Sequence, residues 1–275
     1  MKAIHVTAQS DGRIAIAELP LPCERRTGVG DVEGYRRQAR GEEPISNNYG
    51  PNPADHLRSI TLADGRFTEL ATQPGSLLHF IIGGDLILMP DTPLALTLEP
   101  GDVMLVDGNA APQIVIDARN EGRIVQLGVP SDWPGDDAKV LDSGTINPRG
   151  DHAPNFKRIY TGDREKAFFT EFPEIFGHPV GQWSAPRRVT GFRMLTWVDG
   201  FVDFHPNVVN QMGIILAGQL DLEVGGDGRR EAFRPGDVCL TEDITGEGHR
   251  NFASGVMHVT TIVIPDDQLW PWSRA

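Results

Sequence analysis

The chain has 275 residues, and its 38 acidic residues outnumber its 25 lysines and arginines. The resulting formal charge of -13 disfavours nucleic acid and anionic membranes as partners, because phosphate groups would repel it. No signal-peptide pattern and no apolar run of the roughly 20 residues needed to cross a bilayer is evident. Cys23 and Cys239 are too far apart for a disulfide scaffold or a zinc motif. We therefore expect a cytoplasmic protein.

The apolar runs are short, several alternate with polar residues, and turn residues separate them, which predicts an all-β protein. The N-terminal half contains these predicted strands: Ile14–Ala17, Leu57–Leu62, Phe67–Thr72, Leu77–Ile82, Leu86–Met89, Ala95–Leu98, Val103–Val106, Gln113–Asp117 and Ile124–Val129. The C-terminal half contains Phe156–Tyr160, Ala167–Phe172, Phe192–Val198, Met212–Leu216, Leu220–Val224, Arg230–Phe233, Val238–Thr241 and His258–Ile264. Helical periodicity is weak and best at Val32–Arg40. This strand number favours sandwiches or barrels over βαβ units.

The sequence also repeats itself. Pro100-Gly101-Asp102-Val103 matches Pro235-Gly236-Asp237-Val238, and the apolar segment around Gly84 matches that around Gly218, both at an offset of about 135 residues. One hairpin-rich barrel built twice explains both matches. We therefore predict an N-terminal extension (1–55), a first barrel (56–130), a connector rich in Pro, Gly, Asp and Ser (131–155) and a second barrel (156–275).

Polar residues in the second half follow a distinctive spacing. Gly200 precedes His205-Pro206-Asn207, Gln211 follows after three further residues, and Gly218 follows after six more. Such side chains on facing strands would converge at the mouth of a barrel.

A second segment begins at Gly236-Asp237 and ends at Gly246-Glu247-Gly248-His249. Together the two segments resemble the two motifs of the cupin superfamily, although the second is two residues longer and lacks a proline. The resemblance implies two tandem cupin-type double-stranded β-helix (jelly-roll) barrels, a bicupin. The positions that match His205 and Gln211 in the first repeat are near Ala71 and Leu77, so the first barrel is predicted to lack a ligand set.

The resemblance to metal-binding cupins implies a metal site made of three histidines and one glutamate. This chain keeps His205 and His249, but Asn207 replaces the second histidine and Gln211 replaces the glutamate. His205, Gln211 and His249 could still hold a divalent transition metal (Fe, Mn, Ni, Cu or Zn) weakly, although neutral amides are poor ligands for such ions. A carboxylate from Glu242-Asp243 could supplement this set.

Without a metal, the same residues form a polar pocket of hydrogen-bond donors and acceptors. His205, His249 and Gln211 are then candidate catalytic residues, since a histidine can transfer a proton near neutral pH. Each also has a simpler interpretation, as a surface histidine, a turn residue or a satisfied amide. Candidate substrate-binding residues, for which core packing or a solvated surface is the simpler alternative, are Asn207, Trp183, Arg193, Met212 and Phe204.

These observations favour a small-molecule enzyme that performs acid/base chemistry of the isomerase, cyclase or lyase type. A metal-dependent dioxygenase or decarboxylase is one alternative, and a non-catalytic ligand-binding or structural protein is the other, because a fold does not determine a function. A homodimer is expected.

Overall fold

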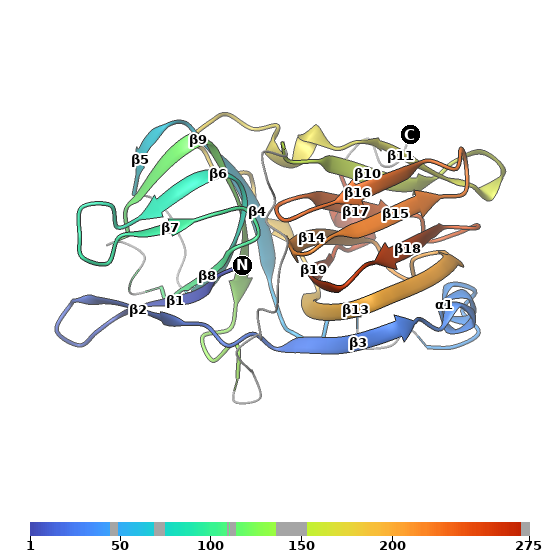
Figure 1. Cartoon of the computed structure of the whole chain (residues 1–275), viewed down its shortest axis with the longest axis horizontal. Helices are drawn as coiled ribbons and strands as arrows, with labels where there is room; N and C mark the ends of the chain where they lie inside the picture. The colour runs from blue at the N-terminus through green and yellow to red at the C-terminus, as the bar shows by residue number, and fades with distance from the viewer. Residues whose placement is uncertain (45–48, 69–74, 109, 111–113, 136–152, 271–275) are drawn as a thin grey trace. The chain divides into compact units, whose positions relative to one another are not determined.

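The computed structural model describes residues 1–44, 49–68, 75–108, 110, 114–135 and 153–270, which are mostly β-strand (Figure 1). The chain divides into two compact units. Residues 1–22, 53–143 and 174–188 form the first, and residues 23–52, 144–173 and 189–275 form the second. The expected extension 1–55 is thus shared between both units, and most of the expected connector lies outside the described residues.

The first unit is a jelly-roll barrel. Its strands are β1 (Ala3–Ala8), β2 (Ile14–Glu18), β4 (His56–Leu62), β5 (Gly65–Phe67), β6 (Ser76–Leu88), β7 (Leu96–Leu98), β8 (Val103–Val106), β9 (Ile116–Val129) and β12 (Arg187–Arg188). In one half of the barrel β4, β9, β6 and β8 lie side by side, and in the other half the far ends of β6 and β9 pair with each other, with β7 and with β5. The long strands β6 and β9 therefore serve both sheets.

The second unit has the same pairing, but two strands each take the place of β6 (β14 and β15) and of β9 (β19 and β18). Its elements are β3 (Cys23–Val29), α1 (Val32–Ala39), β10 (Phe156–Thr161), β11 (Ala167–Glu171), β13 (Gly191–His205), β14 (Gln211–Ala217), β15 (Leu220–Val224), β16 (Arg230–Phe233), β17 (Val238–Glu242), β18 (His249–Ala253) and β19 (Val256–Val263). Three short 3₁₀ segments complete the described chain at Asp163–Glu165, Pro173–Phe176 and Asp266–Gln268. One sheet has the order β13, β19, β14, β17, and the other has β13, β18, β15, β16.

The all-β prediction of two tandem jelly-roll barrels is confirmed by this pairing. Each barrel also carries an added hairpin, because β1 pairs in parallel with β8 and β10 pairs in parallel with β17. The single helix predicted at Val32–Arg40 is α1. None of the helices in the described part of the chain is long and apolar enough to cross a bilayer.

Three strands are longer than predicted because glycines and left-handed residues bend them instead of ending them. Gly84 has φ +71°, and the register between β6 and β9 shifts beside it, so the predicted strands on either side form one bent strand. Asn120 and Glu121, both at φ +57°, bend β9 in the same way. Asp199, at φ +46°, bends β13.

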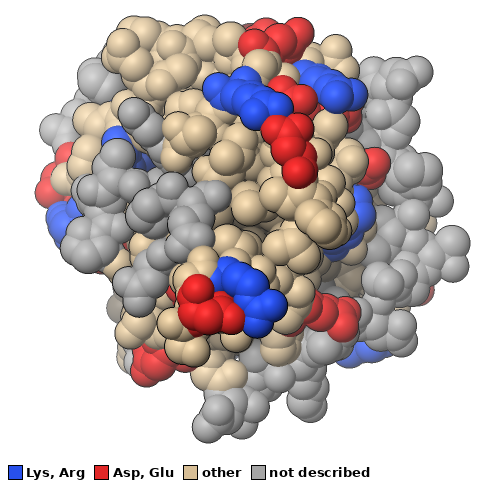
Figure 2. Space-filling model, turned by 90° about the vertical axis from the view of Figure 1, so that its left-hand side faces the viewer, with Lys and Arg blue, Asp and Glu red and all other residues tan. Residues whose placement is uncertain are grey.

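Several exposed charges of the first unit lie in local pairs of opposite sign. On the face in Figure 2, Lys and Arg side chains lie beside Asp and Glu side chains. In the first unit Arg13 contacts Asp11 at 2.7 Å and Arg66 contacts Asp91 at 2.5 Å. Such exposed pairs contribute little to stability.

The repeated Pro-Gly-Asp-Val turn has the same function in both barrels. Asp237 accepts hydrogen bonds from the backbone N–H of Arg234 at 2.7 Å and of Asn155 at 2.8 Å. Asp102, its counterpart, accepts from the backbone N–H of Glu99 at 2.9 Å and of Lys2. Each buried carboxylate thus connects the turn before β8 or β17 to the residue that precedes the added hairpin, which is β1–β2 in the first barrel and β10–β11 in the second.

We expect Asp237→Ala and Asp102→Ala each to lower the free energy of unfolding by about 2–4 kcal/mol, because each leaves two N–H donors without an acceptor. The check is urea denaturation followed by circular dichroism. Asp227→Ala is the matched control, since exposed Asp227 caps the exposed N–H of Arg229. A loss at Asp237 no larger than that at Asp227 would contradict the expectation.

Candidate functional site

The interior of the second barrel is walled by strands that alternate inward and outward side chains. On β13, Arg193, Leu195 and Trp197 face inward, while the residues between them face away. The strand bends at Asp199, and at the next residue, Gly200, a Cβ atom would lie 1.9 Å from the ring of Trp197. Only glycine permits this contact, which explains why the motif begins there.

A chain of four buried or half-buried side chains crosses the barrel mouth. Asp243 is fully buried, and its Oδ2 lies 2.6 Å from Nδ1 of His249. Its Oδ1 accepts a hydrogen bond from Nδ2 of Asn207 at 3.2 Å. Oδ1 of Asn207 in turn accepts from Nε2 of Gln211 at 2.8 Å. From sequence, Asp243 was expected only as a supplementary carboxylate, and its companion Glu242 pairs instead with Arg158.

The carboxylate at one end of this network fixes the orientation of every member. A carboxylate only accepts hydrogen bonds, so Asn207 donates to it and is left with its oxygen toward Gln211. Gln211 must then donate from Nε2, which leaves Oε1 buried with no hydrogen-bond partner among the described residues. On the other side, Asp243 holds the Nδ1–H tautomer of His249, so Nε2 carries the free lone pair.

His205 lies behind His249 instead of on the cavity wall. Its ring centroid is 4.9 Å from that of His249 and 4.6 Å from that of Tyr35, and its Nδ1 lies 2.8 Å from the backbone oxygen of Asp203. Burial, followed by the nearby His249, lowers the pKa of His205 to about 3. His205 is therefore a neutral ring that supports His249 at physiological pH.

Gly248 allows this close pairing. Its φ is +73°, and a Cβ atom there would lie 1.9 Å from the backbone oxygen of His205. A side chain would push β18 away from β13 at the point where the two imidazoles meet, which accounts for the glycine before His249.

Two cavities adjoin these residues. The inner one, of about 90 Å³, lies inside the barrel and is lined by Gln211 and His249 among others. The outer one measures about 490 Å³, within the usual range for small-molecule sites. Their shared lining residues are Arg193, Leu195, Trp197 and Asn251.

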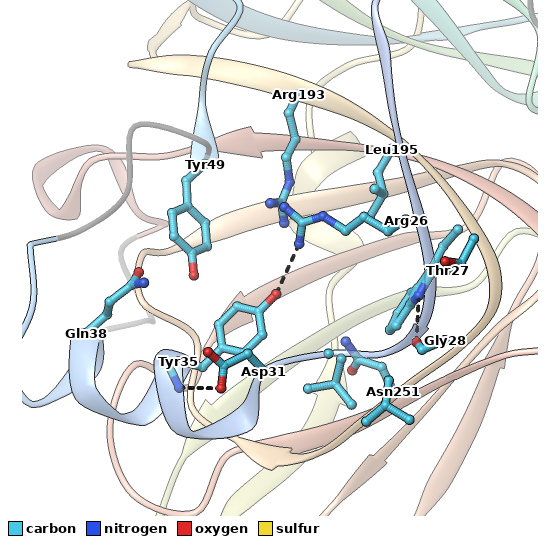
Figure 3. Close-up of a pocket in the computed structure, with 15 residues that line it drawn as sticks. Arg26, Thr27, Gly28, Asp31, Tyr35, Gln38, Tyr49, Arg193, Leu195 and Asn251 are labelled. Atoms are coloured by element: carbon cyan, nitrogen blue, oxygen red, sulfur yellow. Dashed lines mark hydrogen bonds between the residues drawn. The ribbon is translucent and has the colours of Figure 1, made fainter.

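Residues between 26 and 38, together with Tyr49, form one wall of the outer cavity, and the sequence did not single them out. Strand β3 runs parallel to β13, and α1 follows it with Asp31 as the N-cap, which accepts from the N–H of Gly34 at 2.9 Å (Figure 3). Arg26, Tyr35 and Tyr49 belong to this wall. They had no motif signal, because they lie more than a hundred positions from the residues that they face.

The other predicted substrate-binding residues fall in different places. Arg193 lines both cavities. Met212 is buried on the face of β14 opposite Gln211, and Phe204 packs under Arg250, whose guanidinium carbon lies 4.8 Å from the ring centroid. Trp183 belongs to the first unit, where it packs against that core with Arg58 above its ring. Met212, Phe204 and Trp183 line neither of the two cavities.

The donor set does not fit a tightly bound transition metal. Among the described residues no group of three or more His, Cys, Asp and Glu side chains is arranged to hold a metal ion. Asp243, the carboxylate in the network, is already engaged by His249 and Asn207. His205, Gln211 and His249 would offer only neutral ligands, and a neutral amide oxygen is a poor ligand for a transition metal.

The equivalent position in the first barrel is apolar. Gln211 lies opposite Thr241, whereas Leu77 lies opposite Val106 at the same register of the first barrel. Both Leu77 and Val106 are fully or almost fully buried.

No family model and no curated protein matches this chain. Solved structures do match it, at low sequence identity. A cupin 2 conserved barrel domain protein from Leptotrichia buccalis is 13% identical, with 78% of this chain and 85% of that chain covered and a TM-score of 0.40. A protein of unknown function from Pseudomonas syringae pv. tomato is 14% identical (96% and 100% covered, TM-score 0.37). Lactobacillus farciminis oxalate decarboxylase in its formate complex is 15% identical (79% and 78%, TM-score 0.30). The strand pairing described above, and not these scores, establishes the fold.

Proposed function

We propose that this protein, whose two jelly-roll barrels have the cupin architecture, is an enzyme that performs acid/base chemistry on a small organic molecule in its second barrel. One observation carries the proposal: the buried Asp243 carboxylate is bonded to Nδ1 of His249, which leaves the other ring nitrogen available on a residue that lines the inner cavity. A histidine oriented in this way can act as a general base and then as a general acid.

The chemistry follows from the orientation of the network. His249 Nε2 takes a proton from a carbon or oxygen of the substrate, and Asp243 offsets the charge that the ring gains. Gln211 Oε1 accepts a hydrogen bond from the substrate and so fixes its position. The imidazolium then returns the proton to a neighbouring atom, which is an isomerisation, or to a departing group, which is a lyase-type elimination.

The proposal is tested by proton exchange. A panel of small hydroxy, amino and keto acids in D₂O is followed by ¹H NMR for loss of the signal at the carbon next to the carbonyl. We expect at least one acid to exchange with wild-type protein, and His249→Gln to slow that exchange at least ~100-fold, since general-base catalysis contributes about that much. Arg25→Met, an exposed change on β3, should leave the rate unchanged. Exchange that persists in His249→Gln would refute the role of His249, and no exchange by any acid would count against the proposed chemistry.

A further inference from the structure

Arg193 is a cation without a matching anion. It is 7% exposed, it lines both cavities, and its Nε donates to Oγ1 of Thr261 at 3.1 Å. Its guanidinium lies over the ring of Tyr49 at 5.2 Å. It forms no ion pair with any carboxylate in the described part of the chain. A buried guanidinium is costly unless a negative group compensates it.

A second guanidinium faces the same space. Arg26 donates to Glu24 at 2.7 and 3.2 Å, and its Nη1 lies 3.2 Å from the hydroxyl of Tyr35 (Figure 3). Burial is the main cause that lowers the pKa of Arg193, and the positive charge of Arg26 lowers it further. The two cations are thus close enough to repel each other, and both oxygens of Glu24 are already used by Arg26.

The remaining acidic group on the wall does not balance Arg193 either. Asp31 is exposed, and it accepts the N–H of Gly34 at the start of α1. Tyr49 is neutral, since burial raises the pKa of its hydroxyl above the usual value of 10. The outer cavity therefore offers a free positive charge and phenol donors, which is the arrangement that recognises a carboxylate.

Two other residues that line these cavities offer the reverse polarity. Oδ1 of Asn251 and Oε1 of Gln211 are both buried acceptors without a hydrogen-bond partner among the residues that the structure describes. Asn251 lines both cavities and Gln211 lines the inner one. Such acceptors need a donor, such as a hydroxyl or an amino group, to offset their loss of water.

We propose that the two cavities together bind a small hydroxy- or amino-carboxylate, with its carboxylate on Arg193 and its hydroxyl or amino group toward Gln211 and Asn251. Arg26 positions this carboxylate from β3, and the hydroxyl of Tyr35 accepts a hydrogen bond from Arg26 and so holds its guanidinium in place. Tyr35 also packs on His205, and His205 packs on His249. This carboxylate is the substrate class that we infer for the acid/base site. Its binding does not depend on the proposed function, whereas its conversion does.

The test measures binding with three probes by isothermal calorimetry and ligand-observed NMR: lactate, propionate, which lacks the hydroxyl, and lactamide, which lacks the charge. We expect millimolar binding of lactate, weaker binding of propionate and none of lactamide. Arg193→Met should weaken lactate binding at least ~10-fold, and Arg26→Met should weaken it less. Arg25→Met is the matched control, because Arg25 lies on β3 beside Arg26 but is exposed.

Arg193→Met is expected to fold, because methionine fills a similar volume without a desolvated charge, and circular dichroism and thermal unfolding check this. Equal lactate binding by wild type and Arg193→Met, or no carboxylate binding by wild type, would overturn the proposal. Lactate binding that needs Arg193, in a protein that exchanges no proton, would retain the carboxylate site and reject the acid/base function. Exchange that is independent of Arg193 would retain the acid/base function and reject the carboxylate site.

Discussion

Asp243→Asn is expected to lower kcat about 1,000- to 10,000-fold for an acid that the wild type exchanges, while KM changes little. An asparagine at 243 has one acceptor oxygen, so it cannot accept hydrogen bonds from both His249 and Asn207 as Asp243 does. If its oxygen stays toward His249, its amino group meets the amino group of Asn207. If it turns over, its amino group donates to Nδ1 of His249, the proton moves to Nε2, and the base is lost.

A double variant separates the tautomer from the charge. In Asn207→Asp/Asp243→Asn, residue 243 can accept from Nδ1 of His249 and donate to residue 207, which still accepts from Gln211. Every hydrogen bond of the network is restored while the negative charge lies one residue further from His249. We expect this variant to recover at least ~10-fold of the lost kcat, because the correct tautomer returns.

Steady-state kinetics of deuterium exchange provide the measurement. Asp221→Asn is the control on the same barrel, since Asp221 pairs with Arg230 at 2.6 Å and does not line the inner cavity. A kcat for Asp243→Asn above a tenth of the wild-type value would show that the tautomer of His249 does not matter. The KM is expected to rise instead in Arg193→Met, which leaves the network intact.

Local pattern was sufficient to predict the barrels. The strands that face a core on both sides, such as Val103–Val106, are apolar throughout, and the Asp102 and Asp237 turns repeat because each must hold the same two N–H groups. Strand β3 escaped prediction because it lies at an edge, where Glu24 and Arg25 face solvent and no alternation is imposed.

The site could be predicted only in part, for a geometrical reason. The spacing of His205, Gln211 and His249 reflects strands that pair across the barrel, and the rings of His205 and His249 do meet. The sequence could not assign their different functions, since these depend on which ring borders a cavity. Arg26 and Tyr35 were beyond prediction, because only the parallel pairing of β3 with β13 brings them over the mouth.

Acid is expected to destabilise the second barrel largely through His205. Its pKa is about 3 in the folded protein against a usual value of 6.5. The unfolded chain therefore binds a proton between these values that the folded chain does not bind, so the stability present above pH 6.5 is lost as the pH falls toward 3. The slope contributed by one such group reaches about 1.4 kcal/mol per pH unit.

His205→Phe isolates this contribution, because phenylalanine keeps a ring between Tyr35 and His249 but cannot be protonated. At pH 8 the variant should be less stable by about 1–2 kcal/mol, since the hydrogen bond to Asp203 is lost. As the pH falls below 6, wild type should lose stability faster, and the two unfolding free energies should converge near about pH 5. Burial also lowers the pKa of His258, but that residue is present in both proteins and cancels in the difference.

Urea titrations of both proteins, at intervals from about pH 8 to about pH 4.5, measure the two slopes. A steeper loss in wild type than in His205→Phe is the expected result, because only wild type carries the suppressed titration. Parallel slopes would mean that His205 takes up its proton over the same pH range in the folded and the unfolded chain, so that burial does not lower its pKa.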